Sequence, residues 1–183
     1  VNAVGMTISD QVGRFARSTP DGVAFRDPPL TLTWRQTDAR IDRLAEDARR
    51  TLQIAAIVGR SFYYRVLNAI LDAGAVLDER LAELEQANLI YEAAGQPERE
   101  YSFRHALLQE AAYRTILRKH RREFHQRVGE ALEALFPTQL EQYAPTLAYH
   151  FEEAGDVARA VKYYSMAGDT AYRLFAIAEA ESH

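Results

Sequence analysis

The spacing of apolar residues between Leu52 and Phe103 limits what this chain can fold into more than any other feature. Three segments carry apolar residues at helical spacing, and they span Leu52–Val58, Phe62–Leu71 and Leu77–Asn88. Two strand-like segments follow, Leu89–Tyr91 and Tyr101–Phe103, on either side of a polar loop that contains Gly95 and Pro97. The pattern therefore predicts a mainly α fold with a small β-hairpin near residues 89–104.

Three helices followed by a hairpin is the order of elements in a winged-helix domain. We therefore expect a winged-helix-like domain over residues 39–117, with the hairpin as its wing. Before it, the sequence predicts a helix over residues 7–18, two short strands at Val23–Phe25 and Leu30–Trp34, and a helix from Arg35 to about Leu44.

Residues 118–183 have a helical pattern throughout. Helices are predicted over His105–Leu117 and Phe124–Leu135, and two more are predicted to break at Gly155–Asp156 and Gly168–Asp169. Five positions match the tetratricopeptide pattern: Leu147, Ala148, Phe151, Ala160 and Tyr164. Small residues let two antiparallel helices approach, and aromatic residues fill the groove between them. We therefore expect a tetratricopeptide-like array that begins here, with a second repeat starting at Ala171 and cut off.

Composition excludes several classes of function. The net charge of −4 gives no electrostatic reason to expect nucleic acid or an anionic membrane as a partner. The chain has no cysteine, which excludes a disulfide framework and a thiolate zinc site. No apolar run is long enough to span a membrane, and residues 1–15 lack a secretory signal, so we expect a cytoplasmic protein.

Four phrases resemble, in the same order, the region that follows the nucleotide-binding core in STAND-type AAA ATPases: Ala39–Leu44, Leu52–Phe62, Phe103–Tyr113 and Tyr149–Gly155. These large bacterial proteins join adenylate or guanylate cyclase domains, or transcription-regulator domains, to tetratricopeptide arrays. The resemblance covers residues 39–183. It implies a regulatory piece that relays nucleotide state to a helical array, with a neighbouring ATPase domain or another protein as its partner.

This resemblance also implies a role for His105, because a winged-helix histidine in such ATPases contacts bound ADP. His105 stands between a predicted strand and a predicted helix, where an imidazole and the helix dipole together favour an anion. The structural alternative is a histidine that caps its own helix or is satisfied in the core. Which of the two holds is left open by the sequence.

Residues 6–45 resemble a different family, the extreme N-terminus of acyl-CoA synthetases and other adenylate-forming enzymes. The phrases concerned are Ser18–Phe25, Leu32–Gln36 and Arg40–Ala45. Since both families share the last phrase, we expect residues 1–38 to be a synthetase-like segment joined to the rest near this point by a fusion, a frameshift or a mis-assembled reading frame. A fatty-acid–CoA ligase fragment is thus an alternative identity, inactive as it stands.

The sequence offers no catalytic residue and no expected cofactor. Its glycines are scattered singly and no Gly-Lys pair exists, so the phosphate-binding loop of an ATPase is missing. The phosphate loop and C-terminal lysine of adenylate-forming enzymes are missing too. His120 and His125 have no carboxylate at a spacing that indicates a metal site. We therefore expect a chain that is not an enzyme and holds no metal.

A DNA-binding regulator is a further alternative, because the third helix of many winged-helix domains enters the major groove. Here that helix carries Asp78, Glu79, Glu83 and Glu85 against Arg80, a charge balance that repels phosphates. The basic cluster Arg118–Arg122 is expected at a solvated corner between two helices, where it would complement a helix C-terminus or dock an acidic partner. Five C-terminal tyrosines are expected mostly in the core: Tyr143, Tyr149, Tyr163, Tyr164 and Tyr172.

Overall fold

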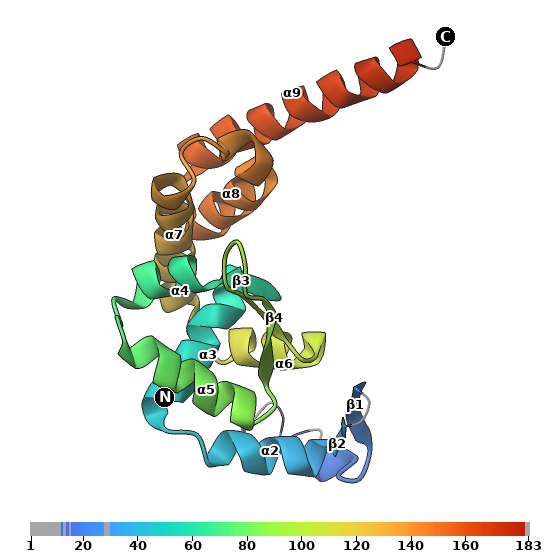
Figure 1. The fold of residues 1–183 in the computed structure, drawn as a ribbon, viewed down its shortest axis with the longest axis vertical. Helices are drawn as coiled ribbons and strands as arrows, with labels where there is room; N and C mark the ends of the chain where they lie inside the picture. The colour runs from blue at the N-terminus through green and yellow to red at the C-terminus, as the bar shows by residue number, and fades with distance from the viewer. Residues whose placement is uncertain (1–11, 13, 15, 28–29, 182–183) are drawn as a thin grey trace. The chain divides into compact units, whose positions relative to one another are not determined.

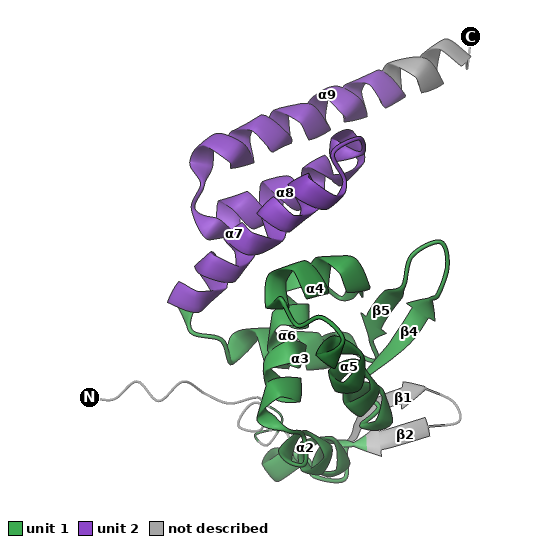
Figure 2. Ribbon diagram, turned by 60° about the vertical axis from the view of Figure 1, so that its left-hand side comes forward, with its two compact units in different colours: residues 1–118 green, residues 119–183 purple. Residues whose placement is uncertain are grey.

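The computed structural model describes residues 12, 14, 16–27 and 30–181, and the chain is mainly helical, as predicted (Figure 1). It divides into two compact units, Val1–Arg118 and Lys119–His183 (Figure 2). Part of the predicted helix over residues 7–18 lies outside the described residues, and those that are described, 12, 14 and 16–18, are helical.

The first unit begins with a β-hairpin and a helix. Strands β1 (Val23–Asp27) and β2 (Leu30–Thr33) pair antiparallel, as predicted, and α2 (Trp34–Asp42) follows directly. Thr33 caps α2 with a capping box, because its Oγ1 accepts from the Gln36 N–H at 3.3 Å and its own N–H donates to Gln36 Oε1 at 2.9 Å. The junction expected after residue 38 therefore falls inside a capped helix, whose Trp34 and Ile41 are buried.

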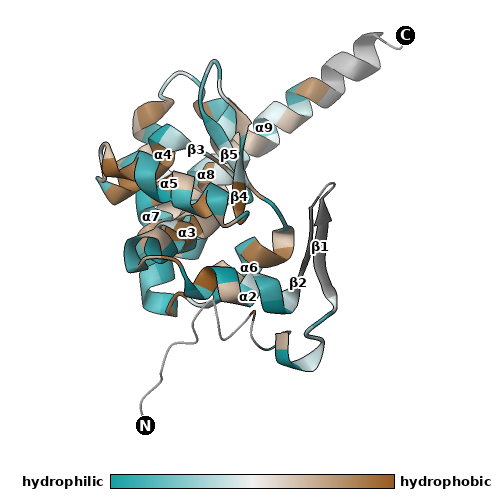
Figure 3. Cartoon of the chain, turned by 60° about the horizontal axis from the view of Figure 1, so that its bottom comes forward, coloured by the Kyte–Doolittle hydropathy of each residue, from teal (hydrophilic) through white to brown (hydrophobic). Residues whose placement is uncertain are grey.

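The rest of this unit is built around α3. The elements in chain order are α3 (Glu46–Val58), β3 (Ser61–Tyr63), α4 (Tyr64–Leu71), α5 (Val76–Gln86), β4 (Ile90–Ala94), β5 (Glu100–Phe103) and α6 (Ala106–Arg114). Nearly every apolar residue of α3 is buried, since α4, α5 and α6 all contact it. Figure 3 shows these helices mixing brown apolar and teal polar stretches. The apolar run that predicted a buried helix at Leu52–Val58 is confirmed.

A three-stranded antiparallel sheet with the order β3-β5-β4 lies in the same unit. The predicted hairpin is confirmed as β4 and β5. The prediction of a helix from Phe62 is wrong at its start, because Phe62 lies in β3 opposite Tyr101, and their rings stack with centroids 5.9 Å apart. Three residues are too few to show an alternating pattern, so β3 is specified by its distant partner β5 rather than by its own sequence.

The second unit consists of three helices, α7 (Arg118–Leu135), α8 (Leu140–Ala154) and α9 (Val157–Glu181). Helices α8 and α9 form an antiparallel pair joined by a tight turn at Gly155, whose φ of +84° is a conformation that favours glycine. The predicted break there is confirmed. The break predicted at Gly168–Asp169 is wrong, because α9 is continuous through it. One interior glycine costs a helix about 1 kcal/mol relative to alanine, and no proline follows to end it.

The basic cluster Arg118–Arg122 lies just after the corner between α6 and α7, and most of its side chains are exposed, as expected. It forms the first turn of α7, however, so its charges lie at a helix N-terminus. The suggested match to a C-terminal dipole is therefore wrong. Arg122 instead lies over Gly155, where a Cβ would meet its guanidinium at 2.2 Å.

Candidate functional site

His105 is the N-cap residue of α6, with extended backbone dihedrals (φ −145°, ψ 140°). Its Nδ1 accepts the Leu107 backbone N–H at 3.1 Å, which satisfies one of the free donors at the helix start. Partial burial, and after it the positive charge of Arg60, lowers the pKa of the imidazole. Because Nδ1 is an acceptor and the ring is neutral near pH 7, its proton is on Nε2.

This geometry matches the structural alternative, a histidine that caps its own helix. The imidazole ring and the positive charge of Arg60 lie together at a helix N-terminus, a setting that favours an anion such as a phosphate or carboxylate. Strand β5 and helix α6 together fix the position of His105, because Phe103 before it is held in the sheet and Leu108 after it is buried. Whether nucleotide binds here stays a prediction.

Loss of this cap should weaken the first unit measurably. We expect His105→Ala to lower the free energy of unfolding by about 1 kcal/mol, since alanine leaves the Leu107 N–H without its acceptor. His105→Asn should lose less, because asparagine is itself a good N-cap. Urea denaturation followed by circular dichroism measures both, with the exposed His120→Ala as the control. Equal stability of the alanine and wild-type chains would contradict the capping role.

The carboxylates of α5 hold neighbouring elements in place. Asp78 accepts from Arg99 Nη1 at 2.7 Å and from the Tyr64 hydroxyl at 3.2 Å, and the hydrogen bond from Arg99 lowers the pKa of Asp78. Glu83 accepts the Ala45 N–H at 2.7 Å, and Glu85 the Glu92 N–H at 3.1 Å. Arg80 is itself paired with Asp47 at 2.8 Å. Four of the five charged side chains of α5 are thus bonded within the unit, and the excess of carboxylates on this helix disfavours contact with DNA phosphates.

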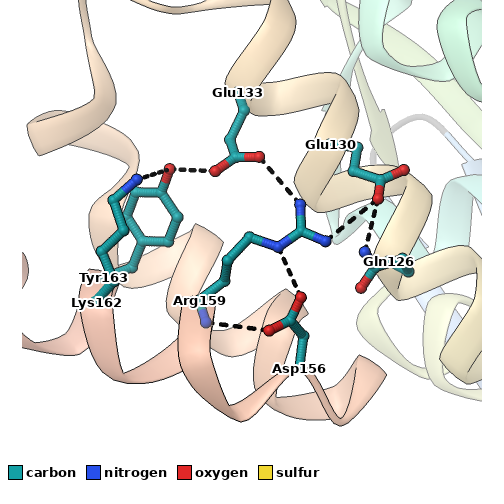
Figure 4. A network of polar contacts seen from close by, with 7 residues as sticks. All are labelled: Gln126, Glu130, Glu133, Asp156, Arg159, Lys162 and Tyr163. Atoms are coloured by element: carbon teal, nitrogen blue, oxygen red, sulfur yellow. Dashed lines mark hydrogen bonds and ion pairs between the residues drawn. The ribbon is translucent and has the colours of Figure 1, made fainter.

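A polar network joins α7 to the start of α9 in the second unit (Figure 4). Its centre is Arg159, which donates to Asp156 Oδ2 at 2.7 Å and to Glu133 Oε2 and Glu130 Oε1 at 3.3 Å each. Asp156 also accepts the backbone N–H of Arg159 at 3.1 Å, and so caps α9. The guanidinium lies 4.2 Å from the ring centroid of Phe151. This cluster fixes helix positions, and sequence reasoning missed it because Arg159 lies 26 residues from Glu133 and 29 from Glu130.

Sequence reasoning also missed a buried histidine pair. His125 on α7 and His150 on α8 are both buried, and their Nδ1 atoms are 2.9 Å apart. One Nδ1 must donate and the other accept, so when both rings are neutral they are different tautomers. Burial, and after it the charge of Arg121, lowers the pKa of His125 to about 4. The one signal in the sequence is that His125 lies three residues before the buried Val128, on the same helix face.

The described residues contain no group of three or more His, Asp or Glu side chains placed to hold a metal ion.

The C-terminal tyrosines divide between core and surface. Tyr163 is fully buried, stacks on Phe151 with a centroid distance of 5.8 Å, and donates to Glu133. Tyr149, Tyr164 and Tyr172 are exposed, so the expectation that most of these tyrosines lie in the core is wrong for them. Tyr164 matched the repeat pattern, but its neighbour Tyr163 occupies the core. One residue of difference turns a side chain by about 100° on a helix.

Comparison with family models, with curated proteins and with solved structures finds no match for this chain. Across the part of the chain that the structure describes, none of the helices combines the length and the apolar character that crossing a membrane requires.

Proposed function

We propose that this chain is a non-catalytic regulatory and protein-interaction module of the kind found in STAND-type signalling ATPases. The observation that carries the proposal is the arrangement of the first unit. A helix, a strand, two helices and a hairpin follow one another, and the sheet order is β3-β5-β4. This arrangement supports a winged-helix-like domain in which β4 and β5 form the wing.

The second unit supports the other half of the proposal. Helices α8 and α9 form an antiparallel pair in which Leu147, Ala148, Phe151 and Ala160 are buried at the positions that a tetratricopeptide repeat uses. Such helix pairs bury their faces against neighbours and present surfaces to proteins. A regulatory domain followed by helices of this kind could transmit the nucleotide state of a neighbouring core to a helical array.

In this proposal His105 is the contact to the nucleotide state of the neighbouring core. It lies where β5 leads into α6 and its Nδ1 caps that helix, so its imidazole ring stands at a helix N-terminus, where a phosphate is favoured. A change in that contact would act on α6, which packs against the central helix α3.

The test adds a separately produced nucleotide-binding core to the chain. The chain is mixed with the nucleotide-binding core of a STAND-type ATPase loaded with fluorescent ADP, and the rate of ADP release is measured by stopped flow. We expect the wild-type chain to slow release severalfold and His105→Asn to abolish most of this effect. Asparagine keeps the helix cap but removes the imidazole ring, so a loss of the effect reports the contact made by the ring rather than the loss of the cap.

His120→Asn, on the exposed first turn of α7, is the matched control and should slow release as the wild type does. The proposal is wrong if the chain leaves ADP release unchanged at saturating concentration. If His105→Asn behaves as the wild type, the interaction role survives but the sensor role of His105 does not.

A further inference from the structure

Three exposed cations stand together at the start of helix α7: Arg118, Lys119 and Arg122. On a helix these positions lie within about 100° of arc and about 6 Å along the axis, so the three side chains share one face. We call them the α7 cations. In the part of the chain that the structure describes, no carboxylate forms an ion pair with any of them.

Arginines on other helices are joined to carboxylates of the same chain. Arg80 on α5 lies 2.8 Å from Asp47 on α3, and Arg173 on α9 lies 2.9 Å from Glu141 on α8. In each case the ion pair connects two elements that are distant in the sequence. These cations thus have partners inside the fold, whereas the α7 cations are directed to solvent with their charges uncompensated by such pairs.

The position of the α7 cations works against the stability of their own helix. The N-terminal end of a helix carries a partial positive charge, so cations are unfavourable there and anions are favourable. Arg118 and Arg122 are four residues apart, and Lys119 and Arg122 are three apart, spacings at which like charges repel. An anion bound at this turn would relieve both effects. Local arrangements that cost stability in this way are expected at functional sites.

Contact with α8 holds one of the three side chains in place. The guanidinium of Arg122 lies against Gly155, where a Cβ would collide with it. Gly155 is the C-cap residue of α8, and the negative end of a helix dipole attracts a cation. The side chain of Arg122 is nevertheless exposed. A cation that is held in place before binding loses less conformational entropy when an anion binds.

We propose that the α7 cations bind a short acidic segment of a partner protein, through two or three of its carboxylates. One turn of helix has room for that number, whereas proteins that bind nucleic acid commonly contact about six to ten phosphates. Because the α7 cations contribute +3 to a net charge of −4, the rest of the chain carries −7 and repels an extended polyanion. A short segment reaches the cations without lying along that negative surface. The inference goes beyond the proposed function and does not depend on it.

Fluorescence anisotropy of a labelled hexaglutamate peptide, titrated with the full chain, tests the inference. We expect saturable binding that weakens severalfold between about 50 and about 200 mM NaCl, and no binding of the matching hexaglutamine peptide. The double variant Arg118→Glu/Lys119→Glu should bind the peptide at least about tenfold more weakly. Arg43→Glu/Arg50→Glu makes the same change of charge at two exposed arginines outside α7, and it should bind within about twofold of the wild type.

Thermal unfolding gives a second readout that a merely structural role would move the other way. Arg118→Glu/Lys119→Glu should raise the Tm, because carboxylates suit a helix N-terminus, and a lower Tm would give the cations a role inside the fold and overturn the inference. No peptide binding at about 1 mM, unchanged binding by this variant, or tighter binding of a duplex oligonucleotide than of the peptide would overturn it as well. None of these outcomes bears on the ADP-release test, which compares variants of His105.

Discussion

Replacement of Phe151 by alanine should lower the free energy of unfolding of the helical unit by about 3–5 kcal/mol. Phe151 is fully buried, stacks on Tyr163 and lies under the guanidinium of Arg159. Its ring also fills the space beside Gly129, where a Cβ would come within 2.6 Å of the ring. Alanine would therefore leave a cavity bordered by all three helices of the unit.

Urea denaturation followed by circular dichroism measures this loss, and Leu117→Ala, which truncates an exposed leucine, is the control, with a change near zero. A double-mutant cycle sharpens the test. Gly129→Ala alone should be destabilising, although alanine is the better helix former, because its methyl group collides with the Phe151 ring. Combined with Phe151→Leu, the two changes should cost less than their sum. Additive losses would show that the Gly129–Phe151 contact is not close.

Acid should destabilise the helical unit through His125. The native state holds its pKa at about 4, against 6.5 in the unfolded chain, because burial disfavours the charged ring. As the pH falls below 6.5, His125 becomes protonated in the unfolded state but not in the native state. The free energy of unfolding therefore declines until about pH 4. The full difference between these pKa values corresponds to about 3 kcal/mol.

The groups that face His125 explain why the native state resists the proton. His150 lies against its Nδ1, the Tyr149 ring packs edge-on at 5.5 Å, and Arg121 contributes a positive charge. A single added proton would place a charge in the core, and a second would set two N–H donors against each other across 2.9 Å.

Unfolding free energies measured between pH 7.5 and 4.5 test this dependence. His125→Gln should flatten the curve over this range, whatever its effect at neutral pH, and His120→Gln on the exposed turn of the same helix should leave it unchanged. Since carboxylates titrate in the same experiment, the informative quantity is the difference between wild type and variant. A His125→Gln curve as steep as that of the wild type would assign the acid sensitivity to other groups.

Local sequence patterns predicted elements whose signal is short-range. The apolar run Leu52–Val58 predicted α3, and two short strand-like segments predicted the antiparallel pair of β1 and β2. The start of β3 and the continuity of α9 were missed for the same reason. Strand β3 exists because Ser61–Tyr63 pairs with residues about 40 positions away, and α9 passes Gly168 because a single glycine costs too little to stop it.

The sequence predicted only part of the candidate site. His105 could be placed at a strand-to-helix junction from its neighbours alone, and the structure shows that its Nδ1 caps α6. The acidic character of α5 could also be read from the sequence, but the partners of its carboxylates could not. Asp78, Glu83 and Glu85 each bind a group on another element, and such partners become neighbours only when the chain folds.

By itself, the sequence determined the mainly helical class, the hairpin of β4 and β5, and the turn at Gly155, because apolar spacing and turn residues act over a few neighbouring positions. The tertiary structure decided which tyrosine enters the core, which histidines meet, and which face of α9 stays exposed. Tyr163 and Tyr164 are adjacent and chemically identical, yet packing against Phe151 and Glu133 selects Tyr163. That choice depends on the rotation of α9 against α7 and α8, and no local pattern specifies it.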